Sequence, residues 1–340
     1  MEQTKKFSIG KRRYIGCKAK LADWIMQIIE TETSDIYSFC DIFAGTAIIS
    51  DIAIKRYNKV IINDFLYSNN IIYKAFYSIG KVDHQKINNY INALNQIDPT
   101  SIEDNYFSEN YGDKFFDFQT SKKIGYIRDN IEKHKDLFSD KEYCILIASL
   151  IYSIDKISNT LGHYEAYIKK EIKPQKLMLR LIDYKSIDYV EIYREDSNQL
   201  VKKISADIFY IDPPYNSRQY SRFYHLYENL VKWDKPTLNG SAMKPEKENM
   251  SEYCSSRAAN AFKDLISNIS AKYIVVSYNN TYHSKSSSSR NKITTEEIKD
   301  ILSKKGHTKV FEHSHQYFNA GKTNFNNHKE YLFITKVYEE

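Results

Sequence analysis

The sequence predicts an α/β fold in which a mostly parallel sheet is interrupted by an inserted helical lobe. Three observations support this: a strand, tight turn, helix and strand near the N-terminus, a long helical stretch after residue 75, and strand-like segments again after residue 184. The chain has 340 residues and is 42% hydrophobic, enough for one large core and an accessory lobe. We expect residues 1–74 and 185–340 to form one domain and residues 75–184 to form the lobe.

The N-terminal elements follow from the hydrophobic pattern. In residues 18–30, "KAKLADWIMQIIE", apolar side chains recur at helical spacing, which predicts an amphipathic helix. Residues 36–42, "IYSFCDI", are β-prone; the turn "FAGT" follows, and "AIISDIAIKR" returns to helical periodicity. A second short strand, "KVIIN", stops at Asp64. This order is the beginning of a parallel sheet.

The rest of the chain has first helical and then strand-like sequence patterns. Between residues 75 and 184 helical patterns predominate, as in "NNYINALNQI", "TSKKIGYIRDNIEKHKDLF" and "EYCILIASLIYSIDKISNTLGHYEAYIKK". Strands are then predicted at "DYVEIYRE", "ADIFYID", "KYIVVSY", "KVFEH" and "EYLFITKV", and we expect the last two to pair antiparallel at the sheet edge. The polar stretches 235–257 and 282–292 are expected to be surface loops.

Composition excludes several classes of protein. The cysteines, Cys17, Cys40, Cys144 and Cys254, are far apart, and we find no C-x-x-C spacing, signal peptide or apolar run near 18 residues. These features argue against secretion, structural zinc and membrane spans, and they favour the cytoplasm. The net charge of +6 suits contact with phosphate backbones. Because the chain is rich in Lys, Asn, Ile and Tyr throughout, the positive charge alone is weak evidence for nucleic-acid binding.

Residues 207–220, "DIFYIDPPYNSRQY", combine a predicted strand with an acidic, proline-rich turn. Asp212 follows the strand, where ligands bind in open α/β sheets. Pro213 and Pro214 make a stiff turn whose carbonyl oxygens are not consumed locally. A carboxylate beside a rigid carbonyl suits a group with two N–H donors, such as the exocyclic amine of a nucleobase, and Tyr215 offers a face for an extruded base. The alternative is a helix-start turn with a buried tyrosine.

The "FAGT" turn predicts an adenosine-binding loop. Asp41, Phe43 and Gly45 follow a strand, and an acid, Asp64, ends the next strand about 20 residues on, the spacing by which α/β folds hold a ribose. The turn has one glycine rather than G-x-G-x-x-G, so S-adenosyl-L-methionine, which lacks phosphates, fits it better than NAD. The alternative is an ordinary turn without a ligand.

With these pieces in order, the chain resembles adenine-specific DNA methyltransferases of the Dam-like class, and more closely the FokI-type modification methylases of restriction systems. The motifs that carry the resemblance are "RRYIGCKAKL", "DIFAGT", "INDFLYSN", "DKISNTLGHYEAY", "DPPYNSRQY", "YHLYENL", "SYNN", "FNAGKT" and "HKEYLF". The resemblance implies a seven-stranded Rossmann-like methyltransferase sheet with an inserted DNA-recognition lobe. It also implies methyl transfer from S-adenosyl-L-methionine to N6 of an adenine flipped out of double-stranded DNA. A cognate restriction endonuclease or a second methylase is then a candidate partner.

The resemblance also assigns roles to residues. For the target amine it implies Asp212, Pro213 and Pro214, with Tyr215 as the stacking ring. For the methyl donor it implies Tyr14, Gly16 and Lys18 at the methionine end, Asp41, Phe43, Ala44, Gly45 and Thr46 in the loop, Asp64 at the ribose, and Asp196 and Asn198 at the adenine. Tyr14 stands where Dam-like enzymes commonly have tryptophan. No cysteine follows a proline, which favours direct transfer without a covalent intermediate.

DNA contacts are expected because base flipping costs a few kcal/mol that phosphate contacts must offset. Arg218 and Arg222 follow the proline turn and are expected at the mouth of the site. Further candidates in the helical lobe are Lys122, Lys123, Arg128, Lys169 and Lys170, with solvated helix faces as the alternative. His163 and Tyr164 are either structural or part of the site wall. An RNA adenine methyltransferase and a non-catalytic DNA-reading subunit are the competing functions.

Overall fold

The computed structural model describes residues 6–281, 290–314 and 329–339, and it divides into two compact units. The helical unit contains the described residues up to Cys17, Leu66–Asp188 and Ser221–Glu248. The sheet unit contains Lys18–Phe65, Tyr189–Tyr220 and the described residues from Asn249 onward. The helical unit is therefore wider than the lobe expected at 75–184, because an N-terminal segment and residues after the proline turn also belong to it.

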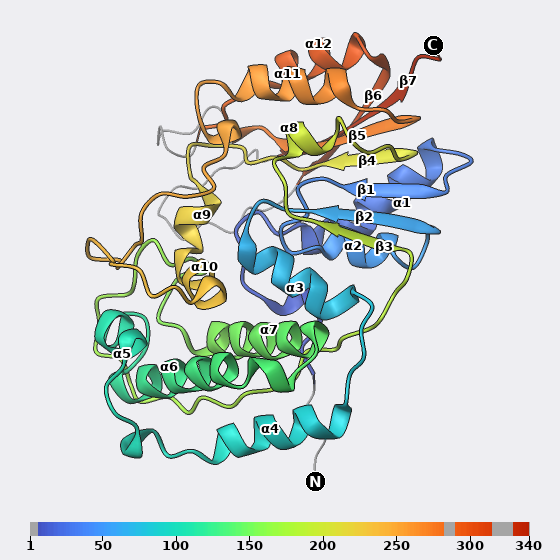
Figure 1. The fold of residues 1–340 in the computed structure, drawn as a ribbon. Helices are drawn as coiled ribbons and strands as arrows, with labels where there is room; N and C mark the ends of the chain where they lie inside the picture. Colours follow the sequence, from blue (N-terminus) through green and yellow to red (C-terminus); the bar gives the residue numbers. More distant parts are fainter. Residues whose placement is uncertain (1–5, 282–289, 315–328, 340) are drawn as a thin grey trace. The chain divides into compact units, whose positions relative to one another are not determined.

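The sheet unit is built on seven strands in the order β3-β2-β1-β4-β5-β7-β6 (Figure 1). β1 to β5 run parallel, whereas β7 is antiparallel to both β5 and β6. The strands are β1 Ser38–Asp41, β2 Lys59–Asn63, β3 Val190–Tyr193, β4 Ile208–Ile211, β5 Tyr273–Asn279, β6 Gly306–Ser314 and β7 Lys329–Val337. This arrangement confirms the predicted seven-stranded Rossmann-like α/β fold and its antiparallel edge pair.

The central strands β4 and β5, "IFYI" and "YIVVSYN", are apolar and buried along their whole length. Such strands need cover from other elements, and helices provide it. One core joins side chains of β1, β2, β4, β5 and β7 to α8 (Ser197–Leu200), α11 (Ala258–Asn268) and α12 (Thr295–Ser303). α2 (Ile48–Ala53) packs on β1 and β2, and α1 (Ala22–Glu32) contacts β7. The expected strand, turn, helix, strand unit is thus present from β1 to β2.

The strand order brings the candidate residues to one edge of the sheet. The chain leaves β1 for β2 on one side, while β4 lies on the other, which is the switch point where open α/β sheets bind ligands. Asp41 pairs in register with Tyr210, so Asp212 follows two residues later at the same edge. Because β7 runs antiparallel, it begins where β5 ends, with Glu330 opposite Asn279.

The helical unit is organised around α7 (Asp140–Ile157), whose residues are buried on nearly every side. Ser139 and Glu142 form a capping box that fixes the beginning of α7. Figure 1 shows α6 and α7 side by side, and α3 packs on α7. The other helices of this unit are α3 Tyr67–Tyr77, α4 His84–Gln96, α5 Tyr106–Tyr111, α6 Phe118–Lys133 and α10 His225–Lys232, and α9 Tyr220–Phe223 begins at its boundary. Among the described residues, no helix is long and apolar enough to cross a membrane.

One expected helix is shorter than the pattern suggested. α7 ends at Ile157, and residues 158–189 are irregular, although "SNTLGHYEAYIKK" continues a helical texture. Ser158 adopts an extended conformation at the helix end, and Gly162 has a φ of +104°, which a continuing helix does not allow. Turn formers therefore end the helix here.

Candidate active site

Asp212 lies directly after β4, and its two carboxylate oxygens have different surroundings. Oδ1 is 3.0 Å from Lys18 Nζ and accepts a hydrogen bond from the Tyr215 hydroxyl. Among the described residues, no hydrogen bond or ion pair is made to Oδ2, and the side chain is 17% exposed. Burial raises the pKa of Asp212, while Lys18 acts in the opposite direction. One oxygen is thus held by the protein, and the other remains for a ligand.

Lys18 is the centre of a buried polar cluster. Its ammonium is 2.7 Å from Glu330 Oε1 and 3.0 Å from Asp212 Oδ1, and it lies 2.6 Å from the Tyr215 hydroxyl. The Lys18 side chain is 7% exposed and that of Glu330 is 4% exposed. Burial alone would lower the pKa of Lys18, but the two carboxylates outweigh it and the pKa is raised. Lys18 therefore stays charged between its two acidic partners.

Tyr215 closes this cluster from the proline turn. Its hydroxyl also lies 3.2 Å from Glu330 Oε1, and its ring packs 4.5 Å from the ring of Tyr278 at a tilt of 59°. The Lys18 ammonium is 4.8 Å from the centroid of the Tyr215 ring. The stacking role expected for Tyr215 stays a prediction, but the hydroxyl holds Asp212.

The glycine turn after β1 encloses a second buried carboxylate. Asp41 Oδ2 accepts a hydrogen bond of 2.6 Å from Ser50, whereas Oδ1 is buried and has no hydrogen-bond partner among the described residues. Burial raises the pKa of Asp41 to about 7, against the effect of Ser50. A buried acceptor without a partner is costly, so this oxygen is suited to a cationic or N–H-bearing ligand.

Asp64 shapes the same turn from the end of β2. Its Oδ2 accepts a hydrogen bond of 3.0 Å from the backbone N–H of Gly45, which has a φ of +54°. A left-handed residue at this point favours glycine, so the turn depends on Gly45. Ala44 N–H bonds to Asn63 at 2.9 Å, and Ala44 and Thr46 are buried. The loop expected to hold the donor is thus tied to the end of the neighbouring strand.

Most of the chain matches a known protein family. Residues 14–286 match the family described as D12 class N6 adenine-specific DNA methyltransferase. The chain belongs to this family. Membership implies a methyl donor and a DNA substrate, and it confirms the resemblance drawn from the motifs.

Several curated proteins that are similar to this chain are named type II methyltransferases or modification methylases. The type II methyltransferase M.FokI of Planomicrobium okeanokoites is 33% identical over 86% of this chain and 47% of its own length. The type II methyltransferase M.NlaIII of Neisseria lactamica is 32% identical over 94% of this chain and 98% of its own length. The modification methylase StsI of Streptococcus sanguinis is 34% identical over 79% of this chain and 44% of its own length. The chain therefore spans about half of the first and third relatives and nearly all of the second.

Asp196 and Asn198 of this D12 class chain lie at α8. Asp196 caps the helix by accepting from Asn198 N–H and Gln199 N–H. The Asn198 side chain donates to the Ala261 carbonyl at 2.8 Å and accepts from the Tyr253 hydroxyl at 2.8 Å. Asp196 thus fixes the beginning of α8 and Asn198 ties α8 to α11, and a contact with the donor's adenine stays a prediction. The ring of Phe43, in the glycine turn, packs edge-on against that of Tyr253, with 5.0 Å between the ring centroids. The two rings together form an apolar surface beside the turn.

Tyr14 and Gly16 belong to the helical unit. The ring of Tyr14 stacks on that of Tyr224 at 4.5 Å, and the Arg12 guanidinium lies 5.0 Å from the Tyr14 ring. Ile15 N–H donates to the Tyr224 hydroxyl at 2.8 Å, and Gly16 is exposed with a φ of +77°. The contacts fix the backbone of this segment, and its donor-binding role stays a prediction.

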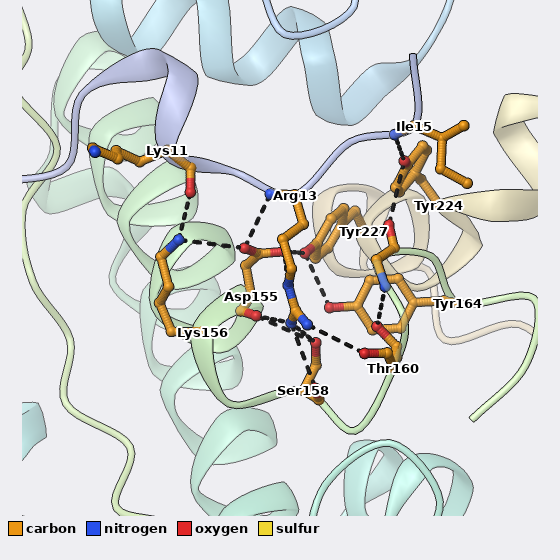
Figure 2. A network of polar contacts seen from close by, with 11 residues as sticks. Lys11, Arg13, Ile15, Asp155, Lys156, Ser158, Thr160, Tyr164, Tyr224 and Tyr227 are labelled. Atoms are coloured by element: carbon orange, nitrogen blue, oxygen red, sulfur yellow. Dashed lines mark hydrogen bonds and ion pairs between the residues drawn. The ribbon is translucent and has the colours of Figure 1, made fainter. Parts of the chain in front are cut away.

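Asp155, in the motif "DKISNTLGHYEAY", is the centre of a network of polar contacts (Figure 2). It is buried, accepts from Arg13 N–H at 3.2 Å and from the Tyr227 hydroxyl at 2.8 Å, and pairs with the Arg13 guanidinium. The Tyr164 hydroxyl donates to Tyr227 at 3.0 Å, and His163 stacks on Phe223 at 4.8 Å. His163 and Tyr164 therefore have structural contacts, in line with the structural alternative.

Two of the residues expected to contact phosphates, Arg128 and Lys123, are buried inside the helical unit. The Arg128 side chain is 0% exposed; it donates to the Leu230 carbonyl at 2.6 Å and pairs with Glu132 at 2.8 Å. Lys123 is buried and donates to the carbonyls of Asn95 and Ile97, both at 2.9 Å. Both side chains satisfy carbonyl groups inside the helical unit, so we withdraw them as phosphate contacts.

The other DNA candidates lie nearer the surface. Lys169 and Lys170 are exposed on the irregular segment after α7, and Lys122 pairs with Asp104 at 3.2 Å. The Arg222 guanidinium donates to the Pro245 carbonyl at 2.8 Å, so it braces the loop that follows α10. Arg218 is half-buried in the sheet unit, where its carbonyl accepts from the Cys254 thiol. DNA contact by these residues stays a prediction. Among the described residues, no group of three or more His, Cys, Asp or Glu is placed to hold a metal ion.

Sequence reasoning missed two acidic residues. Glu330 is part of "HKEYLF", where a charged residue opens an otherwise apolar strand, and this break was its only signal. Glu228, in "YHLYENL", accepts from Tyr67 N–H and Ser68 N–H and caps the beginning of α3. The motif "FNAGKT" lies outside the described residues.

Proposed function

We propose that this protein is a site-specific DNA (adenine-N6)-methyltransferase that transfers a methyl group from S-adenosyl-L-methionine to an adenine flipped out of double-stranded DNA. We further propose that it acts in the cytoplasm as the modification enzyme of a restriction system, with a cognate restriction endonuclease or a second methylase as partner. Family membership and the named activities of the relatives support this proposal.

The observation that carries the proposal is the paired acceptor at the carboxyl end of β4. Asp212 Oδ2 has no described partner, and among the described residues no donor contacts the carbonyl oxygen of Pro213. An exocyclic amine with two N–H groups can donate to both oxygens. Because the amine lone pair is delocalised into the ring, accepting both hydrogen bonds returns electron density to nitrogen and makes it a better nucleophile.

The residues around the glycine turn fit the donor. When bound, S-adenosyl-L-methionine supplies a methyl group activated by its sulfonium. The unpartnered, buried Oδ1 of Asp41 suits the ammonium of the methionine end, and Asp64 suits the ribose hydroxyls. The rings of Phe43 and Tyr253 offer an apolar wall for the adenine. The turn after β1 and the carboxylate after β4 then position the two reactants, which is where most of the rate enhancement would arise.

The helical unit is proposed to supply DNA recognition. Lys169 and Lys170 are exposed cations on an irregular segment and are suited to phosphate oxygens. Arg218 follows the proline turn and is proposed to contact the strand that carries the flipped base. Tyr215 would stack on that base after its hydroxyl has oriented Asp212.

The test is to express the protein in a methylation-deficient bacterial host and to sequence the DNA with detection of modified adenines. We expect N6-methyladenine at one short sequence throughout the genome. Purified protein would then be offered duplex DNA and RNA in competition with a tritiated donor, and calorimetry would measure donor binding. Preferential labelling of RNA would favour an RNA enzyme, and DNA binding without donor binding or methylation would favour a non-catalytic subunit; either result would overturn the proposal.

A further inference from the structure

A basic hollow that the proposed reaction does not use lies on the helical unit. Its volume is about 430 Å³, within the range of about 300–1,000 Å³ that is usual for ligand pockets. Four cations, an aromatic ring and a carboxylate line it: Lys6, Lys11, Lys156, Arg180, Phe7 and Asp183. These residues belong to three parts of the chain that are far apart in sequence, so folding has brought the cations together.

Hydrogen bonds hold the three segments around the basic hollow in place. Phe7 N–H donates to the Leu181 carbonyl at 3.0 Å, and Asp183 N–H donates to the Phe7 carbonyl at 2.8 Å. The Lys156 ammonium, at the end of α7, donates to the Lys11 carbonyl (Figure 2). The cations are therefore attached to a backbone that the fold has already fixed.

The aromatic ring orients one of the cations. Phe7 is 5% exposed, and its ring packs against that of Tyr152 with 5.7 Å between the centroids. The Arg180 guanidinium lies 4.5 Å from the centroid of the Phe7 ring, and among the described residues no acceptor bonds to it. A guanidinium on a ring face is ordered while its N–H donors stay available, which suits the oxygens of a phosphate group.

Three of the four cations lack an acidic partner. Among the described residues, no carboxylate lies at ion-pair distance from Lys6, Lys11 or Arg180. The Lys6 ammonium instead lies 5.3 Å from the centroid of the Tyr184 ring. Asp183 lines the hollow, but it is exposed and forms no ion pair with the part of the chain that the structure describes. Nothing in these contacts ties the three cations to a carboxylate of the fold.

The fourth cation is only loosely paired. Lys156 Nζ is 3.7 Å from Asp155 Oδ2, whereas that oxygen also accepts from Arg13 N–H at 3.2 Å. Asp155 is therefore engaged mainly in the network of Figure 2. Cations gathered around one hollow repel each other, and an anion that enters the hollow relieves this repulsion.

We propose that the basic hollow binds phosphate groups of the DNA backbone, a proposal that rests on the proposed function. Phosphate oxygens accept charge-assisted hydrogen bonds from arginine in a fork and from lysine as a point charge. Lys6, Lys11 and Lys156 are exposed, so a long polyanion can reach them. Arg180 lies on the same irregular segment as Lys169 and Lys170, so the hollow extends the DNA-contacting surface proposed for that segment. Such contacts carry no sequence information and serve affinity rather than recognition.

The test measures binding of a mixed-sequence duplex by fluorescence anisotropy over a range of salt concentrations. Lys11→Ala and Arg180→Ala should each flatten the slope of log K against log salt by about 1, and the double variant by about 2. Arg180→Lys keeps the charge and should keep the slope. The matched control is Lys55→Ala, whose exposed ammonium pairs with Asp51 and should leave the slope unchanged. Because the Lys11 side chain is exposed, urea denaturation of Lys11→Ala should match the wild type.

A second readout locates the anion directly. Ser8 also lines the hollow and is exposed, so maleimide labelling of Ser8→Cys, counted at residue 8 by mass spectrometry, reports on its occupancy. At a duplex concentration of about nine times Kd, mass action predicts about 10-fold slower labelling, whereas the same concentration of inorganic phosphate should have little effect. Protection by inorganic phosphate without protection by the duplex would identify a site for a small anion and overturn the proposal.

The two proposals fail in different ways. Unaltered salt slopes in the Lys11 and Arg180 variants, with normal methylation by the wild type, would overturn the basic hollow as a DNA site and leave the proposed function intact. A wild-type protein that neither binds nor methylates duplex DNA would overturn the proposed function, and the role of the hollow with it.

Discussion

Asp41 should make the protein less stable at neutral pH than it would be with an uncharged side chain. The carboxyl group is 1% exposed, and burial raises its pKa from the ordinary 3.8 to about 7. In the unfolded chain the group is solvated and titrates near its ordinary value. Between these two values the native protein binds a proton that the unfolded chain has released, so the free energy of unfolding falls as pH rises.

The size of the effect follows from this difference. The difference between the ordinary pKa of 3.8 and a pKa of about 7 corresponds to about 4 kcal/mol of stability, at roughly 1.36 kcal/mol per pH unit. This stability is fully present below the ordinary pKa and fully lost above pH 7. Asp41→Asn removes the charge and keeps the shape of the side chain. Its amide N–H groups also need partners, so about 4 kcal/mol is an upper limit for its stabilising effect at pH 8.

Urea denaturation of both proteins between pH 4.5 and 8 measures this directly. We expect the stability advantage of Asp41→Asn to grow as pH rises toward 7 and then to level off. Asp51→Asn, which removes a carboxylate of α2 that pairs with Lys55 near the surface, should give a small difference with no such growth. A pH-independent difference for Asp41→Asn, or a wild type that is the more stable at pH 8, would refute the reasoning.

Three further predictions concern single residues. Gly45→Val places a β-branched residue at a φ of +54° in the donor turn, and calorimetry should show donor affinity at least 10-fold weaker; unchanged affinity would contradict the assigned turn. Arg128→Met leaves the Leu230 and Val231 carbonyls without their donor and removes the ion pair with Glu132, so denaturation should show a loss of about 2–4 kcal/mol, while DNA affinity of the folded protein stays unchanged. Lys169→Ala and Lys170→Ala should each flatten the slope of log K against log salt by about 1 at constant stability, and an unaltered slope would remove them as phosphate contacts.

Local patterns were enough to predict the parts of the site that depend on neighbours in sequence. The buried strand before Asp212, the glycine turn after β1 and the short β2 ending before Asp64 each have a signal within about ten residues, and the structure places all three at one edge of the sheet. The antiparallel pair of β6 and β7 was likewise visible from two adjacent strand patterns.

Contacts between distant residues could not be predicted in this way. Arg128 and Lys123 have the appearance of cations on a polar helix face, but the carbonyls that bind them belong to Leu230 and Asn95, on other segments of the chain. Glu330 meets Lys18 only because β7 runs antiparallel to β5. Burial and long-range pairing decide such cases, and both are properties of the folded chain.

The most direct test of the central claim is single-turnover methylation of duplex DNA by Asp212→Ala. Lys18 remains paired with Glu330 in that variant, so the fold, donor binding and DNA binding should persist. The account predicts that transfer to adenine falls by at least about 1,000-fold, because the amine loses the acceptor that polarises it. Turnover within about tenfold of the wild type would contradict the account.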